Sequence, residues 1–128
     1  MTDRMRQYYA DNPHMVSSPF GGLAGFNREL LLEVFGALAI EIKGRDMLDV
    51  GCGRGYLGDI VTELGGRYFG ADLVVSRSGV RMTLADAQAL PFPDASFDLV
   101  CCFDAFEHVP DIARAAREFR RVLRPGHT

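Results

Sequence analysis

A short apolar run that leads directly into a glycine-rich turn limits most strictly what this chain can fold into. Residues 47–50 read Met-Leu-Asp-Val, and residues 51–55 read Gly-Cys-Gly-Arg-Gly. Apolar residues then recur at helical spacing between residues 56 and 64. A strand, a glycine turn and a helix in this order bring a ligand close to free backbone amides at the helix N-terminus. The sequence therefore predicts a nucleotide-type binding site around this turn.

The spacing of the glycines bears on which ligand this turn can hold. A dinucleotide fingerprint, G-x-G-x-x-G, that begins at Gly51 requires its third glycine at position 56. That position is Tyr56, and the third glycine is Gly55. The pattern is therefore G-x-G-x-G, with Asp49 two residues before it. This spacing argues against a nicotinamide-binding domain, which stays the least favoured alternative.

The rest of the chain alternates predicted helices with predicted strands. The first helix is expected to start at Asn27, to run through Ile42 and to stop at Gly44. Alternation of this kind predicts an α/β fold with a parallel sheet and right-handed crossovers, and continuous apolar strands suit a sheet covered on both faces. The other expected helices cover residues 56–64 and 111–123, and the expected strands cover 47–50, 67–73, 80–85 and 97–103.

Several stretches together carry a family resemblance. Residues 48–55 resemble motif I of class I, Rossmann-like S-adenosylmethionine-dependent methyltransferases, and residues 70–72 resemble motif II. Residues 90–100, 107–111 and 121–126 resemble the type 11 subgroup. The resemblance implies a three-layer α/β/α fold whose partial, mainly parallel sheet has the strand order 3-2-1-4, with strands 5–7 missing. It also implies an N-terminal lid or arm over residues 1–26 and the N-terminal half of a methyltransferase domain over 27–128.

The resemblance also implies how S-adenosyl-L-methionine would bind. The glycine loop would hold its amino-acid and ribose portions, and Asp49 would face the charged amino-acid end, directly or through water. Asp72 can accept hydrogen bonds from ribose hydroxyls, and Asp86 would bond the adenine amino group. The expected cofactor-binding residues are Asp49, Gly51, Cys52, Gly53, Gly55, Asp72, Leu73, Asp86, Ala87 and Phe103.

The reaction implied is methyl transfer to a small-molecule acceptor, with S-adenosyl-L-homocysteine as product. The cofactor carries the reactive group, so no nucleophilic side chain is needed. His108 is the candidate for deprotonating the acceptor, because the ordinary pKa of histidine lies near neutrality; a histidine that only fixes its loop is the alternative. A catalytically incomplete binding or interaction module is the alternative for the whole chain. No metal-ligand spacing is present, so no metal is expected.

Composition bears on partners and location. The net charge is −3, which gives no basic footprint for nucleic acid, and no stretch is apolar enough to span a membrane. The three cysteines lack disulfide-framework spacing, so they are expected to be free in the cytoplasm. Four arginines near the C-terminus are expected to form a solvated helix face: Arg117, Arg120, Arg121 and Arg124.

Two features depart from the resembled family. Between Asp72 and Asp86 only 13 residues intervene, so a loop or a single turn is expected in place of a crossover helix. The strand expected at residues 97–103 would be an apolar sheet edge, and such edges favour association. We expect a homodimer or the N-terminal segment to cover it. Whether the chain is a truncated form or a compact relic stays open at this point.

Overall fold

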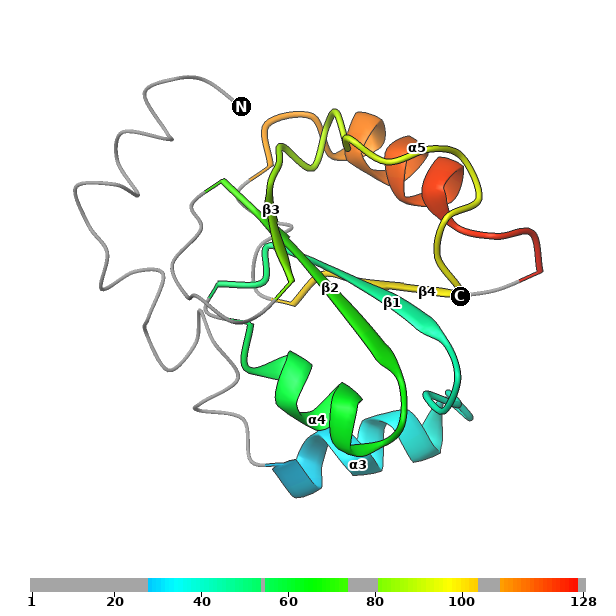
Figure 1. Ribbon diagram of the computed structural model, residues 1–128. Helices are drawn as coiled ribbons and strands as arrows, with labels where there is room; N and C mark the ends of the chain where they lie inside the picture. Colours follow the sequence, from blue (N-terminus) through cyan, green and yellow to red (C-terminus); the bar gives the residue numbers. More distant parts are fainter. Residues whose placement is uncertain (1–27, 54, 74–80, 104–108, 127–128) are drawn as a thin grey trace.

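The computed structural model describes residues 28–53, 55–73, 81–103 and 109–126, which form a parallel sheet between two layers of helices (Figure 1). The strands are β1 (Asp46–Val50), β2 (Arg67–Asp72), β3 (Met82–Leu84) and β4 (Leu99–Cys101), in the order β3-β2-β1-β4. Helices α3 (Arg28–Ala37) and α4 (Leu57–Glu63) cover one face, and α5 (Ile112–Val122) covers the other. The predicted α/β class, layering and strand order are confirmed.

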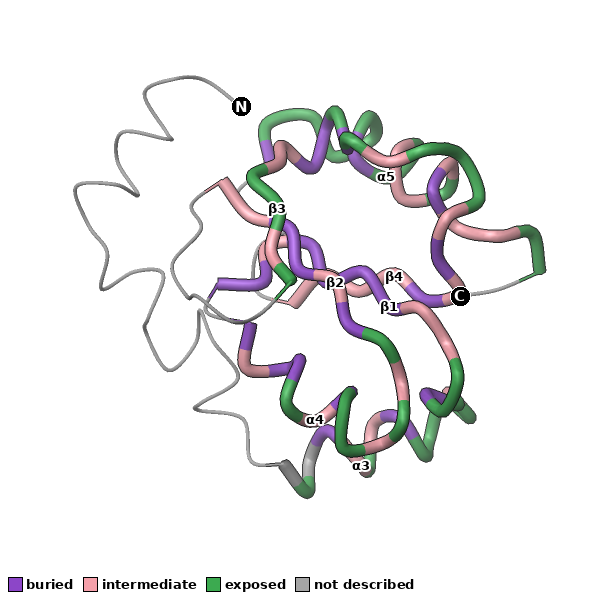
Figure 2. The backbone as a smooth tube through the Cα atoms, viewed as in Figure 1, coloured by how far each residue is buried: buried purple, intermediate pink, exposed green. Residues whose placement is uncertain are grey.

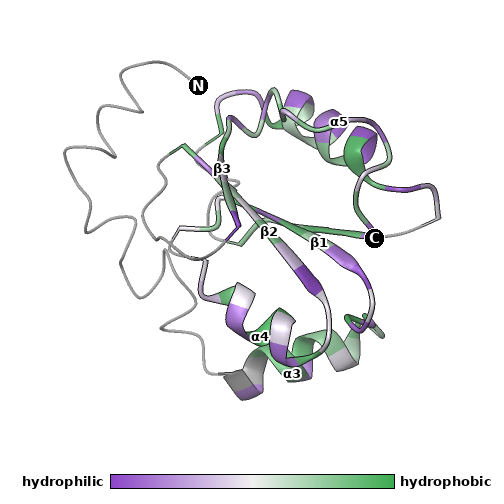
Figure 3. Cartoon of the chain, viewed as in Figure 1, coloured by the Kyte–Doolittle hydropathy of each residue, from purple (hydrophilic) through white to green (hydrophobic). Residues whose placement is uncertain are grey.

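The sheet separates two apolar cores. Successive side chains of a strand point to opposite faces, so Met47 of β1 packs toward α3 and α4 while Leu48 packs toward α5. Both residues are almost fully buried, and the tube in Figure 2 is buried along most of β1. The helices are amphipathic against this sheet, as the hydropathy colours of α5 show in Figure 3. Burial on both faces explains why Met47, Leu48 and Val50 of β1 are all apolar although they point to both sides of the sheet.

Helix α3 is shorter than predicted. It ends at Ala37, well before the predicted stop at Gly44. Ala39 has a positive φ of 52°, and the amide of Ile40 donates to the carbonyl of Phe35 at 2.8 Å. A left-handed residue followed by such a six-to-one hydrogen bond is the Schellman closure of a helix. Non-glycine residues seldom adopt this conformation, which is why the sequence pattern predicted that the helix would stop at Gly44.

Strand β4 is also shorter than the predicted strand at residues 97–103. Phe97 does not pair with β1; it forms a parallel bridge with Leu123, and its amide donates to the carbonyl of Val122 at 3.0 Å. The first part of the predicted strand thus binds the end of α5. Strand β3 covers three of the five described residues, 81–85, in the stretch predicted for it. The segment 74–80, where a loop or single turn is expected, lies outside the described residues.

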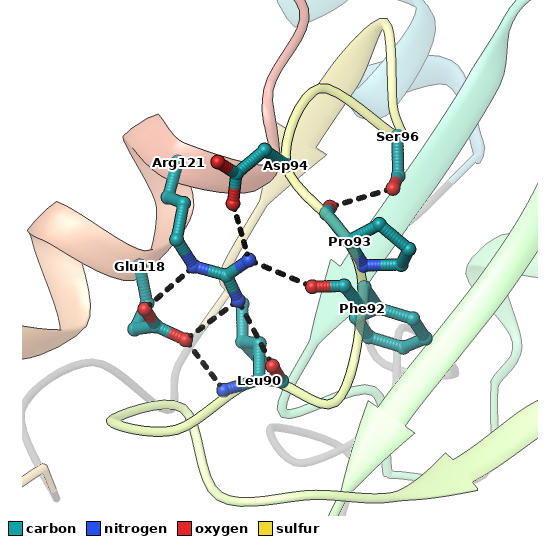
Figure 4. Close-up of polar contacts among 7 residues, drawn as sticks. All are labelled: Leu90, Phe92, Pro93, Asp94, Ser96, Glu118 and Arg121. Atoms are coloured by element: carbon teal, nitrogen blue, oxygen red, sulfur yellow. Dashed lines mark hydrogen bonds and ion pairs between the residues drawn. The ribbon is translucent and has the colours of Figure 1, made fainter.

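Helix α5 begins after Asp111, whose carboxylate caps the helix by accepting the amide of Arg114 at 3.0 Å. Near its other end, Glu118 accepts the Nε–H of Arg121 at 2.8 Å. Arg121 also fastens α5 to the turn before β4 (Figure 4). Its acceptors in that turn are the carbonyls of Leu90 and Phe92 and the carboxylate of Asp94.

The predicted solvated face of arginines is therefore only half correct. Arg117 and Arg120 are exposed. Arg121 is engaged as above, and Arg124 forms ion pairs with Asp98 at 2.9 Å and with Asp46 at 3.2 Å. The prediction is wrong for these last two residues because their partners come from segments distant in sequence.

Candidate cofactor site

The glycine loop follows β1 at the carboxyl edge of the sheet. Gly51, Gly53 and Gly55 have φ angles of 72°, 56° and 71°, a region that residues with a Cβ seldom adopt. The amides of Gly51 and Cys52 both donate to the carbonyl of Ala71, at 2.7 and 3.2 Å. The loop is therefore held on the end of the neighbouring strand β2. The glycines of the motif stand where the backbone adopts a left-handed conformation.

Asp72 ends β2 and binds this loop directly. Its Oδ2 accepts the amide of Gly53 at 2.8 Å, and its Oδ1 accepts the amide of Leu73 at 2.7 Å. The carboxylate is half-buried. A carboxylate at this position is the kind of acceptor that ribose hydroxyls require, because each of its oxygens can accept more than one hydrogen bond. The structure thus brings three of the predicted site residues into direct contact.

Asp49 lies behind the loop and is only 4% exposed. Its Oδ2 accepts the hydroxyl of Tyr68 at 2.6 Å, and its Oδ1 accepts the thiol of Cys101 at 3.7 Å. Burial raises the pKa of Asp49 to about 7, while the two donors act to lower it and the charge of Asp72 adds to the rise. The acid of the motif is therefore poised near neutrality and held by side chains of two neighbouring strands.

Cys52 is a buried member of the same loop. Its Sγ donates to the carbonyl of Gly53 at 3.7 Å, and a Cβ placed on Gly70 would lie only 2.8 Å from that sulfur. Burial, with the negative charges of Asp49 and Asp72, raises the pKa of the Cys52 thiol far above its ordinary value. A thiol held protonated in this way is unreactive, so Cys52 packs the underside of the loop.

Asp86 follows β3 in a tight turn. Its Oδ1 accepts both the backbone amide of Gln88 at 2.9 Å and the side-chain amide of Gln88 at 3.2 Å. The carbonyl of Asp72 accepts the amide of Ala85 at 2.8 Å, which places the turn beside the end of β2. The other end of the Gln88 side chain accepts the amide of Asp111 at 3.1 Å. Gln88 thereby connects the predicted adenine-binding turn to the cap of α5.

The remaining predicted residues do not all share one face of the sheet. Ala87 is buried in the core beneath α5, whereas Phe103 packs against the core beneath α3 and α4. His108 and the arm at residues 1–26 lie outside the described residues, so their roles stay predictions.

Tyr68 and Gln88 were not among the predicted site residues. A tyrosine in the middle of a buried strand needs a partner for its hydroxyl, and this is the signal that could have found Tyr68. Met47 pairs with Tyr68 and Asp49 with Gly70 in the parallel register, so Tyr68 stands two pairs away from the acid, on the same face of the sheet. No local sequence pattern indicates the contact from Gln88 to α5.

Comparison with known proteins identifies the family of this chain. The family described as "Methyltransferase domain" matches residues 48–128. This chain belongs to that family. A probable S-adenosylmethionine-dependent methyltransferase of Mycolicibacterium smegmatis is 39% identical over 101 residues, which cover 73% of this chain and 39% of the relative. A ubiquinone biosynthesis O-methyltransferase of Pseudomonas fluorescens is 35% identical over 101 residues, which cover 68% of this chain and 43% of the relative.

A solved structure agrees with this assignment. The crystal structure of an S-adenosylmethionine-dependent methyltransferase from Mesorhizobium loti superposes with a TM-score of 0.66 at 28% identity, over 80% of this chain and 51% of that chain. The resemblance to a class I, Rossmann-like methyltransferase is thus confirmed. The methyltransferase domain described here spans about two fifths of the length of the two curated relatives.

Three further observations concern the cysteines, metal ligands and helices of the described residues. All three cysteines, Cys52, Cys101 and Cys102, are free. Among the described residues no three His, Cys, Asp or Glu side chains gather as metal ligands could. None of the helices in the described ranges has the length and apolarity needed to cross a membrane.

Proposed function

We propose that this methyltransferase domain binds S-adenosyl-L-methionine where β1 and β2 end, and transfers its methyl group to a small-molecule acceptor. The observation that carries this proposal is the 2.8 Å contact between the Asp72 carboxylate and the amide of Gly53. It places an acceptor for ribose hydroxyls beside Gly53, a residue whose backbone a ligand can approach closely. The similarity to S-adenosylmethionine-dependent methyltransferases of Mycolicibacterium smegmatis and Mesorhizobium loti supports the same cofactor.

The chemistry of the donor set fits this cofactor. Asp49, Asp72 and Asp86 each stand at or beyond the carboxyl end of a parallel strand, and all three strands are neighbours in the sheet. Acidic groups there suit a ligand that carries an ammonium group, ribose hydroxyls and an exocyclic amine. Asp49 would face the ammonium group directly or through water, Asp72 the ribose, and Asp86 with the amide of Ala87 the adenine.

The chain's own residues would mainly bind and orient. When bound, the cofactor supplies a methyl group on a sulfonium, which passes to the acceptor while a thioether, S-adenosyl-L-homocysteine, is left. Holding the acceptor in line with that methyl group can supply much of the acceleration. His108 stays the predicted base for an acceptor hydroxyl or amine. The net charge of −3 supports a small acceptor over a nucleic acid.

The test of this function is the formation of S-adenosyl-L-homocysteine by the purified chain with a panel of hydroxylated and amine-bearing small molecules. Turnover that is lost in Asp72→Ala supports the proposal. A second candidate function is a cofactor-binding module without turnover. The described residues of the site are ones that would bind the cofactor, which is all that such a module requires. If the chain binds S-adenosyl-L-methionine but forms no S-adenosyl-L-homocysteine with any acceptor of the panel, the binding module is the function.

We also propose that two copies of the chain associate along β4. In the described residues β4 pairs only with β1, which leaves its other edge free of a strand. Apolar sheet edges associate readily. Sedimentation equilibrium should show a dimer, with slow amide exchange at residues 99–101. A monomer whose β4 amides exchange fast would contradict this assembly, whereas a monomer with protected amides would assign the covering role to residues 1–26.

A cytoplasmic location is a further proposal, supported by the three free cysteines. Fractionation of cells that express the tagged chain should place it with cytoplasmic markers, and recovery with secreted or membrane markers would contradict it.

We propose that the chain divides into an arm at residues 1–26 and the domain at 27–128. Limited proteolysis should cut near residue 27 and leave a resistant core. Cleavage at similar rates in residues 1–26 and in residues 27–128 would contradict this division.

A further inference from the structure

Tyr68 reaches Asp49 through space that two glycines leave open. A Cβ on Gly58 of α4 would lie 2.9 Å from the Cδ1 atom of the Tyr68 ring, and a Cβ on Gly70 of β2 would lie 3.3 Å from its Cε1 atom. Gly70 is also the register partner of Asp49 across β1 and β2. The absence of side chains at both positions leaves room for the ring, whose hydroxyl contacts the acid.

The hydroxyl of Tyr68 is the stronger of the two side-chain donors to Asp49. Its oxygen lies 2.6 Å from Oδ2, whereas the thiol of Cys101 is a weak donor at 3.7 Å from Oδ1. Tyr68 is itself 6% exposed, so water does not compete for this contact. One phenol therefore decides where this carboxylate points.

The titratable groups around Asp49 come from three elements. Tyr68 and Asp72 face it from β2, Cys101 from β4, and Cys52 from the loop. The side chains that α3 and α4 contribute to this core are apolar. Burial raises the pKa of Asp49 to about 7, and the hydrogen bond from Tyr68 opposes that rise. The carboxylate thus depends on Tyr68 to stay charged at neutral pH.

We propose that Tyr68 is a positioning residue, which holds the Asp49 carboxylate in the orientation that meets the ammonium group of the cofactor. The inference rests on the proposed function for the identity of the ligand. Without the hydroxyl, the same buried carboxylate keeps only a thiol donor, and its pKa rises. Cofactor binding then weakens at neutral pH and recovers at higher pH. A tyrosine that merely fills space would alter binding equally at every pH.

The variant Tyr68→Phe keeps the ring and removes only the donor. S-adenosyl-L-homocysteine, which retains the ammonium group, is the probe, and calorimetry gives its Kd from about pH 5.5 to 8.5, a range that brackets the Asp49 midpoint. We expect the midpoint of the binding profile to rise by about one pH unit, which makes binding about fivefold weaker at pH 7. An unchanged midpoint would overturn the inference.

Two matched variants show whether Tyr68 acts through Asp49. Cys101→Ala removes the weaker donor and should move the midpoint less than Tyr68→Phe does. In an Asp49→Asn background the acid no longer titrates, so adding Tyr68→Phe should produce no pH-dependent change. A shift of the midpoint that persists in that background would contradict the inference.

A measurement on the unmodified chain covers the case in which Tyr68→Phe does not fold. The ¹³C resonances of Tyr68 Cζ and Asp49 Cγ should titrate with one common midpoint, because the two groups share a proton-sensitive contact. Separate midpoints would overturn the inference even without a variant. Failure of the chain to bind the probe at any pH would instead refute the proposed function, which keeps the two failures distinguishable.

Discussion

The carboxylate of Asp72 accepts the amide of Gly53 at 2.8 Å, and this contact fixes the glycine loop after β1 to the end of β2. Two backbone hydrogen bonds to Ala71 hold the preceding residues of the loop on the same strand. The loop is thus shaped by its neighbour in the sheet before any ligand arrives, and several consequences can be measured.

Replacing Asp72 by alanine should weaken binding of S-adenosyl-L-methionine by about 1–3 kcal/mol, because ligand hydroxyls and the Gly53 amide lose their acceptor. Asp72→Asn should cost less, since its amide oxygen can still accept. Calorimetry measures both. Asp59→Ala, on the exposed side of α4, serves as the control and should bind as the unmodified chain does. Equal affinity for Asp72→Ala would remove Asp72 from the site.

The acid at position 49 should make folding depend on pH. Its pKa is about 7 in the folded chain against 3.8 ordinarily, so the folded state binds this proton more tightly than the unfolded state. Stability from this group is complete at low pH and is lost as pH rises toward about 7. Between about pH 5 and 8 the unmodified chain should lose about 2–3 kcal/mol more unfolding free energy than Asp49→Asn does. Unfolding free energies, measured with urea, that change with pH by the same amount in the two proteins would contradict this.

The contacts of Arg121 should stabilise the fold. Arg121→Met leaves Glu118 and the carbonyl of Leu90 without this donor. We expect the free energy of unfolding to fall by about 1–3 kcal/mol, measured by urea denaturation. Arg120→Met, one residue earlier and exposed, should change it by less than about 0.5 kcal/mol. Similar effects for the two variants would show that the Arg121 contacts in Figure 4 add nothing to the stability of the fold.

Replacing Gly58 by alanine should destabilise the chain although alanine favours helices. The new Cβ would meet the ring of Tyr68 at 2.9 Å, and overpacking of this kind costs about 1–3 kcal/mol. Thr62→Ala, on an exposed position of the same helix, should be neutral or slightly stabilising. Thermal unfolding separates the two expectations, and a stabilised Gly58→Ala protein would refute this packing.

Local patterns in the sequence were sufficient to predict the loop and the sheet. Met47 and Leu48 are both apolar because both faces of β1 are covered, and Gly51, Gly53 and Gly55 mark backbone conformations that other residues avoid. Strand order followed from the family resemblance. These features depend on neighbours in the chain, or on a pattern shared by a whole family.

Contacts between distant segments could not be predicted in this way. Arg121 lies at helical spacing typical of a solvated face, yet its acceptors Leu90 and Asp94 come from a turn before β4. Tyr68 gains its role only because parallel pairing sets it beside Asp49. In each case tertiary packing outweighs the local preference.

The most direct measurement is calorimetry of the chain with S-adenosyl-L-methionine, S-adenosyl-L-homocysteine and NAD. A site built on Gly51, Gly53, Gly55 and Asp72 predicts that the first two ligands bind and that NAD does not. Binding of NAD alone would contradict the assignment of this site.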